Sequence, residues 1–467
     1  MTADVVALLR AALGDRVDTS TASREAARAD KSGHAAVGTP LAIVHATSVR
    51  DVQETLRTAS ATGTPVVTRG AATGLAGGAN AGAGEIALSM RSMNRLLEVR
   101  AEDLLAVVEP GILNADLDRG LAPHGLWWPP DPASREVSTV GGNIATGAGG
   151  LLCAKYGVVR DAVLALDVVL ADGRLLHLGH RSVKGVTGLD LTALMIGSEG
   201  TLGVIVGATL KLRRRVPGAP RTLTATFTGV RDAANAAAAV TASGRQPAIM
   251  ELMDAASLAA VHAHLALPDP SRGEAQLTVQ TDGPTAADDA GAIAAVLAAC
   301  GGEVRLAEDD SDAAQLWRVR RSLHPAMEAL GTTLIEDVSV PRSALPAMFD
   351  EIARIEREYA LTIPTVCHAG DGNLHPNFVF TGPDVPDAVW AAADDLFRAA
   401  LRLGGTLTGE HGIGVLKRRW LKVELGEDQW QLQRQIARVF DPAGILNPGK
   451  VFAPPPPSSA VPYHGGT

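Results

Sequence analysis

Three glycine-rich loops in the first half of the chain constrain the fold more than any other feature. They cover residues 69–78, 138–150 and 197–203, and apolar runs at 65–68 and 204–212 adjoin the first and the third. Short apolar runs bounded by glycine are typical of buried strands. Consecutive small residues leave backbone N–H groups accessible, and successive N–H groups form a nest for phosphate oxygens. One such loop is usually a turn, but three together predict a large polyanionic ligand between two subdomains.

A dinucleotide-binding Rossmann unit does not fit this pattern. Its glycine loop must lead directly into a helix. Here the first loop is followed by the glycine-rich residues 79–84 and then by an apolar strand at 86–90. The sequence therefore argues against a nicotinamide-type Rossmann domain.

The second half of the chain reads as alternating strands and helices. It begins after three arginines at 213–215, where Pro217 and Gly218 interrupt the pattern. The expected strands cover 222–227, 248–253, 275–280 and 333–340, and the expected helices cover 230–242, 254–265, 284–300, 390–403 and 427–440. Such alternation is typical of an α+β sandwich.

Two histidines flank a turn late in the chain. His368 and His375 lie on either side of Gly-Asp-Gly-Asn, between expected strands at 361–366 and 377–380. These turn residues supply positive φ angles and Asx-turn geometry, so the imidazoles are expected to converge on neighbouring strand ends. Converging imidazoles are typical of a site for a divalent transition metal. A hydrogen-bonded turn without a metal is the alternative for histidines at this spacing.

A carboxylate and a third imidazole stand side by side at Glu410 and His411, between two glycines. Glycine neighbours indicate that the backbone approaches another group closely. Adjacent residues of an extended segment point to opposite sides. We therefore expect one of the pair to bind the metal and the other to face a substrate. Cys367 is either a soft metal ligand or a small buried strand residue, and its type favours burial.

Composition excludes several classes of protein. A chain of 467 residues exceeds one ordinary core, so two or three domains are expected. The net charge of −9 gives no general attraction to nucleic acid. Three widely spaced cysteines favour a reducing compartment over a disulfide framework. Neither a signal peptide nor a transmembrane run is recognisable. We expect a cytoplasmic protein, with peripheral attachment to a membrane left open.

The order of these motifs resembles the vanillyl-alcohol-oxidase (VAO) flavoprotein superfamily. The glycine loops, with Trp-Pro-Pro-Asp-Pro at 128–132 and Lys-Tyr-Gly at 155–157 between them, are similar to its FAD-binding half. The later His-Ala-Gly-Asp-Gly-Asn-Leu-His-Pro, Gly-Glu-His-Gly-Ile-Gly and Gly-Ile-Leu-Asn-Pro-Gly-Lys segments resemble its FAD-dependent D-2-hydroxyacid dehydrogenase branch. That branch includes glycolate oxidase D subunits, D-lactate dehydrogenases and D-2-hydroxyglutarate dehydrogenases.

The resemblance implies an α+β fold of the p-cresol methylhydroxylase/vanillyl-alcohol oxidase (PCMH/VAO) type. It places an N-terminal helix and lead-in at 1–37 and a two-subdomain FAD-binding domain at 38–215. An α+β substrate domain, or cap, follows at 216–405. A C-terminal segment at 406–452 returns to the flavin and completes the active site. Residues 453–467, which are rich in proline, are expected to form a flexible tail.

The implied FAD is bound non-covalently, because covalently flavinylated relatives carry histidine where Thr73 stands. The implied contacts come from the three loops, from the segment after Trp128 and from the C-terminal return. They are Arg69, Gly70, Ala71, Ala72, Thr73, Gly74, Gly77, Gly78, Pro130, Asp131, Ser134, Ser138, Gly141, Gly142, Asn143, Gly147, Gly197, Glu199, Gly200, Gly203 and Asn447.

The implied reaction oxidises a small (R)-2-hydroxy acid, D-lactate or glycolate, to the 2-oxo acid while FAD is reduced. His368, His375 and Glu410 would bind one divalent metal, zinc first and iron or manganese as alternatives. The metal lowers the pKa of the substrate hydroxyl. Neutral His411 then removes the hydroxyl proton.

The resemblance also implies two substrate contacts. Arg320 matches an arginine that binds the substrate carboxylate, and a guanidinium grips a carboxylate with two parallel hydrogen bonds. Asn377 matches an asparagine that D-2-hydroxyglutarate dehydrogenases place beside the substrate. Ile335, however, stands where those enzymes carry a lysine for the second carboxylate. The two signals conflict, so D-2-hydroxyglutarate stays open as an alternative substrate.

Other functions stay open from sequence alone. A metal-dependent hydrolase would use the same His368, His375 and Glu410, with purely structural glycine loops. A non-catalytic flavin-binding subunit is the third reading. A quinone, a cytochrome, an electron-transfer flavoprotein or iron–sulfur partner subunits are all conceivable electron acceptors. A homodimer is compatible with the sequence.

Overall fold

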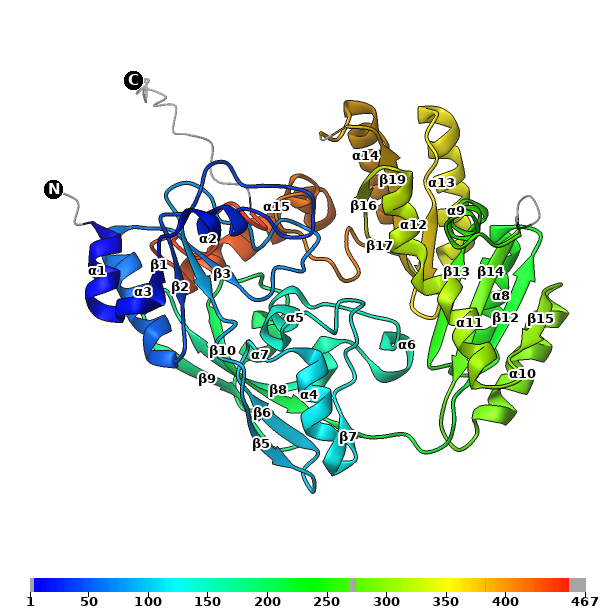
Figure 1. Ribbon diagram of the computed structural model, residues 1–467, viewed down its shortest axis with the longest axis horizontal. Coiled ribbons are helices and arrows are strands. Elements are labelled where there is room, and N and C mark those ends of the chain that lie inside the picture. The colour runs from blue at the N-terminus through cyan, green and yellow to red at the C-terminus, as the bar shows by residue number, and fades with distance from the viewer. Residues whose placement is uncertain (1–3, 269, 271–273, 383, 453–467) are drawn as a thin grey trace, which may run out of the picture.

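The computed structural model describes residues 4–268, 270, 274–382 and 384–452, so the flexible tail expected at 453–467 lies outside the described residues. Figure 1 shows an N-terminal lobe, drawn in blue to green, beside a second lobe in green to yellow. The orange and red C-terminal segment leaves the second lobe and returns to the first. Among the described residues, no helix combines the length and the apolar character needed to cross a bilayer.

The first sheet of the N-terminal lobe carries the first glycine loop. It has the order β1-β2-β4-β3, in which β2, β4 and β3 are parallel. Its strands are β1 (Val17–Asp18), β2 (Ala42–His45), β3 (Val66–Arg69) and β4 (Ile86–Ser89). Helices α1 (Val5–Leu13), α2 (Thr21–Ala26) and α3 (Val49–Thr62) accompany it. The Ser48 side chain caps α3, as its position before the apolar run predicts.

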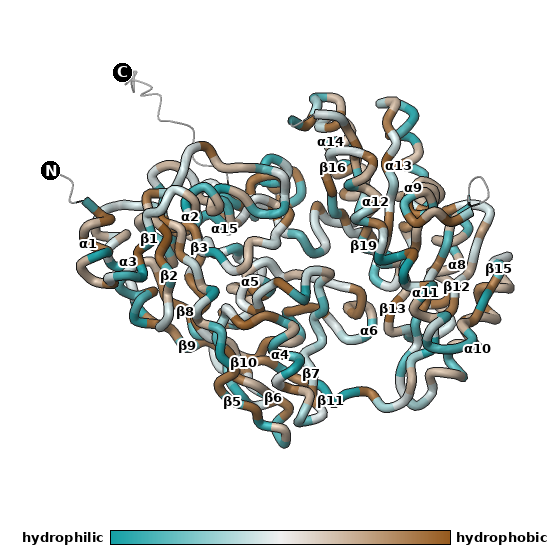
Figure 2. The backbone as a smooth tube through the Cα atoms, in the orientation of Figure 1, coloured by the Kyte–Doolittle hydropathy of each residue, from teal (hydrophilic) through white to brown (hydrophobic). Residues whose placement is uncertain are grey.

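The second sheet of this lobe is antiparallel and has the order β5-β6-β10-β8-β9. Its strands are β5 (Leu96–Arg100), β6 (Leu105–Val108), β8 (Val163–Val169), β9 (Leu175–Gly179) and β10 (Val204–Lys211). The accompanying elements are α4 (Asn114–Leu121), β7 (Leu126–Trp127), α5 (Val140–Thr146), α6 (Cys153–Tyr156), α7 (Leu191–Met195) and β11 (Arg213–Arg214). Strands β5, β6 and β10 are largely hydrophobic in Figure 2 and contribute to a buried core.

The second lobe is built on one large sheet of order β15-β12-β14-β13-β18-β19-β16, with β17 also paired to β19. Its strands are β12 (Arg221–Phe227), β13 (Ile249–Met253), β14 (Ala275–Thr281), β15 (Glu303–Leu306), β16 (Thr332–Ile335), β17 (Val338–Ser339), β18 (Thr365–His368) and β19 (Asn373–Phe380). Its helices are α8 (Val230–Ala242), α9 (Ala255–Leu265), α10 (Ala286–Ala299), α11 (Asp310–Arg321), α12 (Leu323–Leu330), α13 (Leu345–Tyr359) and α14 (Asp387–Arg402).

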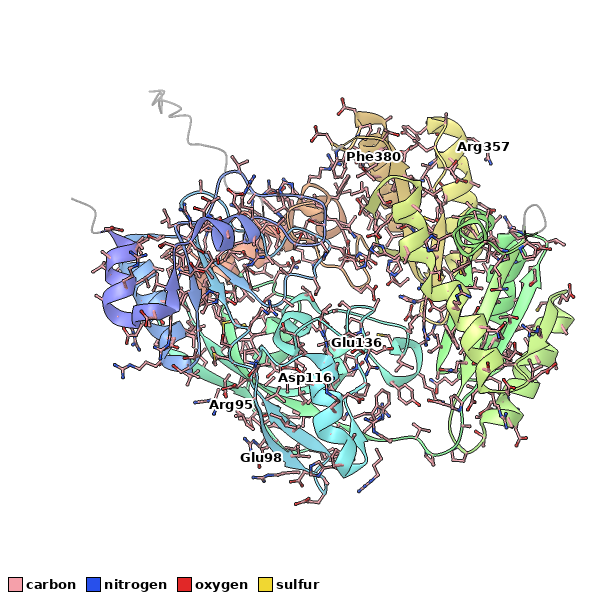
Figure 3. The ribbon with its side chains drawn as sticks, in the orientation of Figure 1. Arg95, Glu98, Asp116, Glu136, Arg357 and Phe380 are labelled. Carbon is pink, nitrogen blue, oxygen red and sulfur yellow. The ribbon has the colours of Figure 1, made fainter. Side chains whose placement is uncertain are left out.

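Charged side chains of this structure are divided between the periphery and a few buried positions. Arg95 and Arg357 are exposed and project outward in Figure 3. By contrast, Glu251 and Asp337 are among the most buried residues of the second lobe. A buried carboxylate is costly unless it is paired, so these two positions deserve a functional explanation.

The hairpin β18–β19 carries both histidines of the predicted turn, but its strand boundaries differ from the prediction. Pro364 has no N–H for a strand ladder, and β18 begins only at Thr365. His375 lies within β19 rather than beyond a strand end, opposite Val366, while His368 lies opposite Asn373. Residues two apart on paired strands share one face of a sheet, so both imidazoles project from the same side.

The turn of this hairpin requires a glycine at position 372. Gly372 has a φ of 92°, and a Cβ atom there would lie 2.1 Å from the carbonyl oxygen of Val340. The expected single strand at 333–340 is also wrong, because it breaks at Glu336 and Asp337 into β16 and β17. The carboxylate of Asp337 binds the C-terminal segment instead of lying on a continuous ladder.

The C-terminal segment links the two lobes. Helix α15 (Arg418–Phe440) is kinked at Gly426. The sequence predicted a helix only from residue 427 onward, just beyond this kink. Beyond it, Val66 donates its N–H to Ile445 at 2.7 Å, and Asn447 donates to Val66 at 2.8 Å. Residues 445–447 thus join the edge of the first sheet, next to the first glycine loop.

Candidate active site

A cavity lies between the two sheets of the N-terminal lobe and the C-terminal segment. The predicted cofactor residues that line it are Gly70, Ala71, Ala72, Thr73, Gly74, Gly78, Ser134, Gly141, Gly142, Asn143, Glu199, Gly200, Gly203 and Asn447. Glu410 and His411 line the same cavity. The three glycine loops and the C-terminal return therefore surround one space.

The other predicted cofactor residues lie outside this lining. They are Arg69, Gly77, Pro130, Asp131, Ser138, Gly147 and Gly197. Arg69 turns its guanidinium to backbone carbonyls, among them that of Ala29 at 3.1 Å. Asp131 accepts the N–H of Leu152 at 3.0 Å, and burial raises the pKa of its carboxyl to about 7. These two side chains stabilise the loops rather than contact the cavity.

The second glycine loop contains a helix that the sequence pattern did not reveal. Thr139 caps α5 by accepting the N–H of Gly142 at 3.2 Å, so residues 140–146 are helical rather than loop. A threonine before a run of small residues is an N-cap signal, and Thr139 itself lines the cavity.

Three of the seven non-glycine residues with positive φ in the described part of the chain line the cavity. Ala72, Glu199 and Asn447 have φ angles of 57°, 51° and 43°, and all three line it. Residues other than glycine pay a free-energy cost in this region of φ, and such residues cluster at ligand sites. The positive φ values therefore support a binding role for this cavity.

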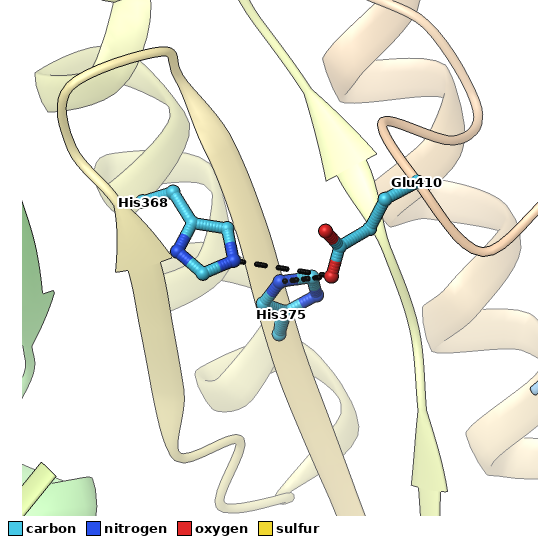
Figure 4. A group of neighbouring side chains, drawn as sticks. All are labelled: His368, His375 and Glu410. Carbon is cyan, nitrogen blue, oxygen red and sulfur yellow. Dashed lines mark ion pairs between the residues drawn. The ribbon is translucent and has the colours of Figure 1, made fainter. Parts of the chain in front are cut away.

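Three imidazoles surround one carboxylate at the edge of the cavity. Glu410 Oε1 lies 3.8 Å from His368 Nε2, 3.2 Å from His375 Nε2 and 3.4 Å from His411 Nε2. The first two contacts are drawn in Figure 4. The His375 and His411 rings are stacked, with centroids 5.0 Å apart. The hairpin of the second lobe and the C-terminal segment thus supply one cluster.

The donor set of His368, His375 and Glu410 fits a divalent metal. Their ligand atoms lie within 4.8 Å of one another. Two ligands of one tetrahedral zinc ion, each about 2.1 Å from it, lie about 3.4 Å apart. The measured separations from Glu410 are close to this value. In addition, the buried Nδ1 atoms of His375 and His411 have no hydrogen-bond partner among the described residues.

Burial and mutual pairing shape the charges of the cluster. Burial raises the pKa of Glu410, but hydrogen bonds from the three imidazoles outweigh it and hold the pKa well below its ordinary value. Burial lowers the pKa of His375. Burial has the same effect on His368, but the Glu251 and Glu410 carboxylates raise its pKa well above the usual value. The cluster therefore favours the ionised form of Glu410.

Glu410 and His411 do not point to opposite sides, as an extended segment would require. Their backbone bends around the Asp337 carboxylate, which accepts the N–H groups of Gly409, Glu410 and His411 at 3.1, 3.1 and 2.9 Å. Successive N–H groups that converge on one anion form a nest, which forces a tight bend. Both side chains consequently face the same cluster.

Lys417 compensates the negative charge of the Asp337 carboxylate. The sequence pattern did not single out this lysine. Its buried Nζ donates to the carbonyl of Asp337 at 2.7 Å and lies 3.7 Å from Glu336 and 3.6 Å from the Asp337 carboxylate. Burial opposes ionisation of Asp337, but Lys417 and the imidazoles outweigh it and lower its pKa.

The predicted substrate residues lie beside the cluster. Arg320 on α11 donates Nε to Glu251 Oε2 at 2.8 Å, and Glu251 Oε1 lies 2.6 Å from His368 Nδ1. Asn377 lies two residues beyond His375 on β19, opposite Ile335. Its amide group donates to the carbonyls of Pro364 and His375 at 2.9 and 2.8 Å. Cys367 is fully buried, which agrees with the structural reading of that residue.

Comparison with known proteins identifies relatives of both lobes. The family described as FAD linked oxidases, C-terminal domain, matches residues 216–451, and the family described as FAD binding domain matches residues 40–179. Glycolate oxidase subunit GlcD of Bacillus subtilis is 37% identical over 89% of this chain and 89% of its own. A D-lactate dehydrogenase of Archaeoglobus fulgidus is 36% identical over 88% of this chain and 90% of its own.

A solved structure of p-cresol methylhydroxylase with substrate bound shares the fold. It has a TM-score of 0.78 and 18% identity, over 96% of each chain. The predicted α+β fold of the PCMH/VAO type is confirmed.

Replacing Asp337 by Asn is expected to loosen the bend that holds Glu410 and His411. The amide offers one acceptor oxygen, and its NH₂ group would face N–H donors. Hydrogen bonds to a charged group contribute about 1.5–3 kcal/mol, so hydrogen exchange at the amides of 409–411 should accelerate at least about tenfold. The amides of Ile413 and Gly414 donate to Glu199 instead, at 2.7 and 2.8 Å, and serve as an internal control. Unchanged exchange at 409–411 would contradict the role of Asp337.

Proposed function

Because the chain belongs to the FAD-linked oxidase family and is an oxidoreductase, we propose that it oxidises a small (R)-2-hydroxy acid to the 2-oxo acid. D-lactate and glycolate are the proposed substrates, in line with relatives named glycolate oxidase subunit and D-lactate dehydrogenase. The observation that carries the proposal is the position of Glu410 and His411. Both belong to the imidazole–carboxylate cluster and also line the cavity of the glycine loops.

Two cofactors are part of this proposal. FAD would occupy the cavity of the glycine loops without a covalent bond and, when bound, accept the two electrons that leave the substrate. One divalent metal, zinc first and iron or manganese as alternatives, would be held by His368, His375 and Glu410 and polarise the substrate hydroxyl. Two imidazoles and a carboxylate are a ligand set that leaves a position for substrate.

His411 is the proposed base. Its Nε2 lies 3.4 Å from Glu410 Oε1, so its ring faces the place where the hydroxyl of a bound substrate would meet the metal ligands. A neutral imidazole at this point can accept the hydroxyl proton as the Cα–H bond breaks. The ring stacks on His375, which restricts its plane.

Arg320 is the proposed anchor for the substrate carboxylate. Glu251 binds the edge of its guanidinium formed by Nε and Nη2, each at 2.8 Å. A guanidinium carries five N–H donors in a planar fork, so its Nη1 side can address a second carboxylate. The hydroxyl and carboxylate of one 2-hydroxy acid would then meet the metal ligands and Arg320 respectively.

The neighbourhood of Asn377 favours a small substrate side chain over a dicarboxylate. The amide N–H groups of Asn377 are used by the backbone carbonyls of Pro364 and His375. Its cross-strand neighbour is the apolar Ile335. D-2-hydroxyglutarate is therefore the weaker candidate. A cytoplasmic location, the electron acceptor and a homodimer stay predictions from the sequence.

Anaerobic mixing with single hydroxy acids tests the function. The purified holoprotein should be yellow, and its flavin absorbance should bleach with D-lactate or glycolate but not with L-lactate. The set also includes D-malate, D-2-hydroxyglutarate and D-mandelate, which define the side-chain pocket. A flavin that stays oxidised with every acid would contradict the proposal and favour a non-catalytic flavin-binding subunit.

Replacing His411 by Ala should leave FAD and metal bound but slow flavin reduction by about 10² or more, since a positioned base contributes about 10²–10⁴. Stopped-flow absorbance measures the rate. His324→Ala, which removes an exposed imidazole of α12, is the control and should reduce its flavin at the normal rate. Near-normal reduction in the His411 variant would remove this residue from the mechanism.

Replacing His375 by Ala should lower the metal content of the purified protein, because a ligand is lost while the FAD cavity is untouched. Elemental analysis and the flavin spectrum of the same sample separate the two effects. We expect less than a tenth of the metal of the His324→Ala control, with one FAD in both. Equal metal content in the two variants would show that His375 is not a ligand.

A further inference from the structure

We propose that Glu251 is a positioning residue that fixes His368 and Arg320 relative to each other. Its role rests on the proposed function, in which His368 binds the metal and Arg320 binds the substrate carboxylate. Glu251 itself carries neither task. The structure assigns Glu251 instead to linking His368 and Arg320, which receive the two ends of the substrate.

The contacts of Glu251 reach both partners at once. Its side chain is 0% exposed, in the middle of the fully buried strand β13. One oxygen, Oε1, lies 2.6 Å from His368 Nδ1, and the other, Oε2, accepts from Nε of Arg320 at 2.8 Å and lies 2.8 Å from its Nη2. Both carboxylate oxygens are therefore engaged by different residues.

The sheet and a helix set this arrangement. Glu251 on β13 is the direct cross-strand neighbour of His368 on β18. Arg320 reaches it from α11, a helix that packs beside the same sheet. The carboxylate of Glu251 is consequently within reach of the His368 imidazole on the next strand and of the Arg320 guanidinium on helix α11.

The bond to Glu251 determines which nitrogen of His368 faces the metal position. The Glu251 carboxylate accepts a hydrogen bond from the N–H at Nδ1, so the lone pair of the neutral ring is left on Nε2. Nε2 is the atom that lies 3.8 Å from Glu410 Oε1. Carboxylates that orient a metal-binding imidazole in this way typically change metal affinity by about 10–100-fold when they are removed. Glu251 lies on the far side of the ring and is not itself one of the clustered ligands.

The same carboxylate orients Arg320. By binding Nε and Nη2, the Glu251 carboxylate fixes the plane of the guanidinium. The Nη1 side of the guanidinium then points away from Glu251. The hydroxyl and carboxylate of a 2-hydroxy acid sit on adjacent carbons, so their two receptors must keep a short and constant separation. Glu251 sets that separation through two hydrogen-bonded contacts.

Glu251→Gln is the informative variant because it keeps the shape and removes one acceptor. The amide oxygen of glutamine can serve His368 or Arg320, while its NH₂ group must face the other. If NH₂ faces His368, the ring is driven to carry its proton on Nε2. If NH₂ faces Arg320, two donors oppose each other. Either orientation disrupts one of the two partners.

The primary measurement is metal affinity, read without turnover. The metal-free holoprotein is titrated with Zn²⁺ against a chelating indicator, and Glu251→Gln should bind about 10–100-fold more weakly than the unchanged protein. In steady-state assays KM for the 2-hydroxy acid should rise as well. Wild-type metal affinity together with a wild-type KM in Glu251→Gln would overturn the proposal.

A double variant tests the link between the partners. If Glu251 acts on the substrate through Arg320, the KM increase in Glu251→Gln/Arg320→Gln should fall short of the product of the single increases. Strictly multiplicative increases would overturn this part of the proposal. The coupling is absent if Glu251 serves only the packing of β13.

Asp254→Asn is the matched control. Asp254 follows three residues later, directly after the same strand as the N-cap of α9, and accepts the N–H groups of Ser257 and Thr365 at 2.8 and 2.9 Å. This variant should keep metal affinity and KM at normal values. Equal losses in it would show a general response of the sheet and overturn the specific role of Glu251.

Two further observations keep the test decisive. Should Glu251→Gln fail to fold, Glu251→Asp replaces it: the shortened carboxylate cannot reach both partners, and normal affinity with normal KM would again overturn the proposal. A wild-type flavin that no hydroxy acid reduces would defeat the proposed function alone, since the zinc titration still reports on Glu251 and His368.

Discussion

The geometry of the site depends on two buried carboxylates that hold the C-terminal segment from opposite lobes. Asp337, in the second lobe, accepts the N–H groups of 409–411, and Glu199, in the N-terminal lobe, accepts those of Ile413 and Gly414. The bonds to Asp337, whose pKa is lowered, are charge-assisted and stronger than neutral ones. Glu410 and His411 are thus fixed only when both lobes and the C-terminal segment are assembled.

A second chain of buried contacts alternates basic and acidic side chains. It runs from Arg320 to Glu251, then to His368, and on to Glu410. Each member is buried or nearly so, and an isolated charge at such a depth would be costly. Because each group lies against at least one partner of the opposite kind, the chain is tolerated and the orientation of each side chain is restricted. Orientation is what a site needs when it must receive two adjacent groups of a small substrate.

The sequence predicted the elements better than the directions of the side chains. Helix α8 was expected at its observed bounds, and His368, His375 and Glu410 were expected to meet. The opposite orientations expected for Glu410 and His411 were wrong, because no local pattern reveals that Asp337 bends their backbone. The partners lie more than seventy residues apart in sequence, and such a contact leaves no periodicity.

Glu251 and Lys417 were missed for a related reason, since their partners are distant in sequence. The sequence nevertheless holds a signal for Glu251. An acidic residue between Met250 and Leu252, inside an apolar strand, is a buried charge in need of a partner. That reasoning gives the existence of a partner but not its identity, since cross-strand register is set by the whole sheet. His368 becomes the neighbour of Glu251 only when β13 and β18 pair.

The glycine density of the second loop has two physical causes, which the sequence alone could not separate. Gly141 lies within α5 beside the cavity, and a Cβ atom there would lie 2.4 Å from the side chain of Pro110. At Gly149, by contrast, a Cβ atom would lie 2.7 Å from Glu410 Oε2. This glycine is required because the N-terminal lobe must approach the predicted metal ligand closely. One run of small residues therefore serves both the packing of the N-terminal lobe beside the cavity and the junction with the C-terminal segment.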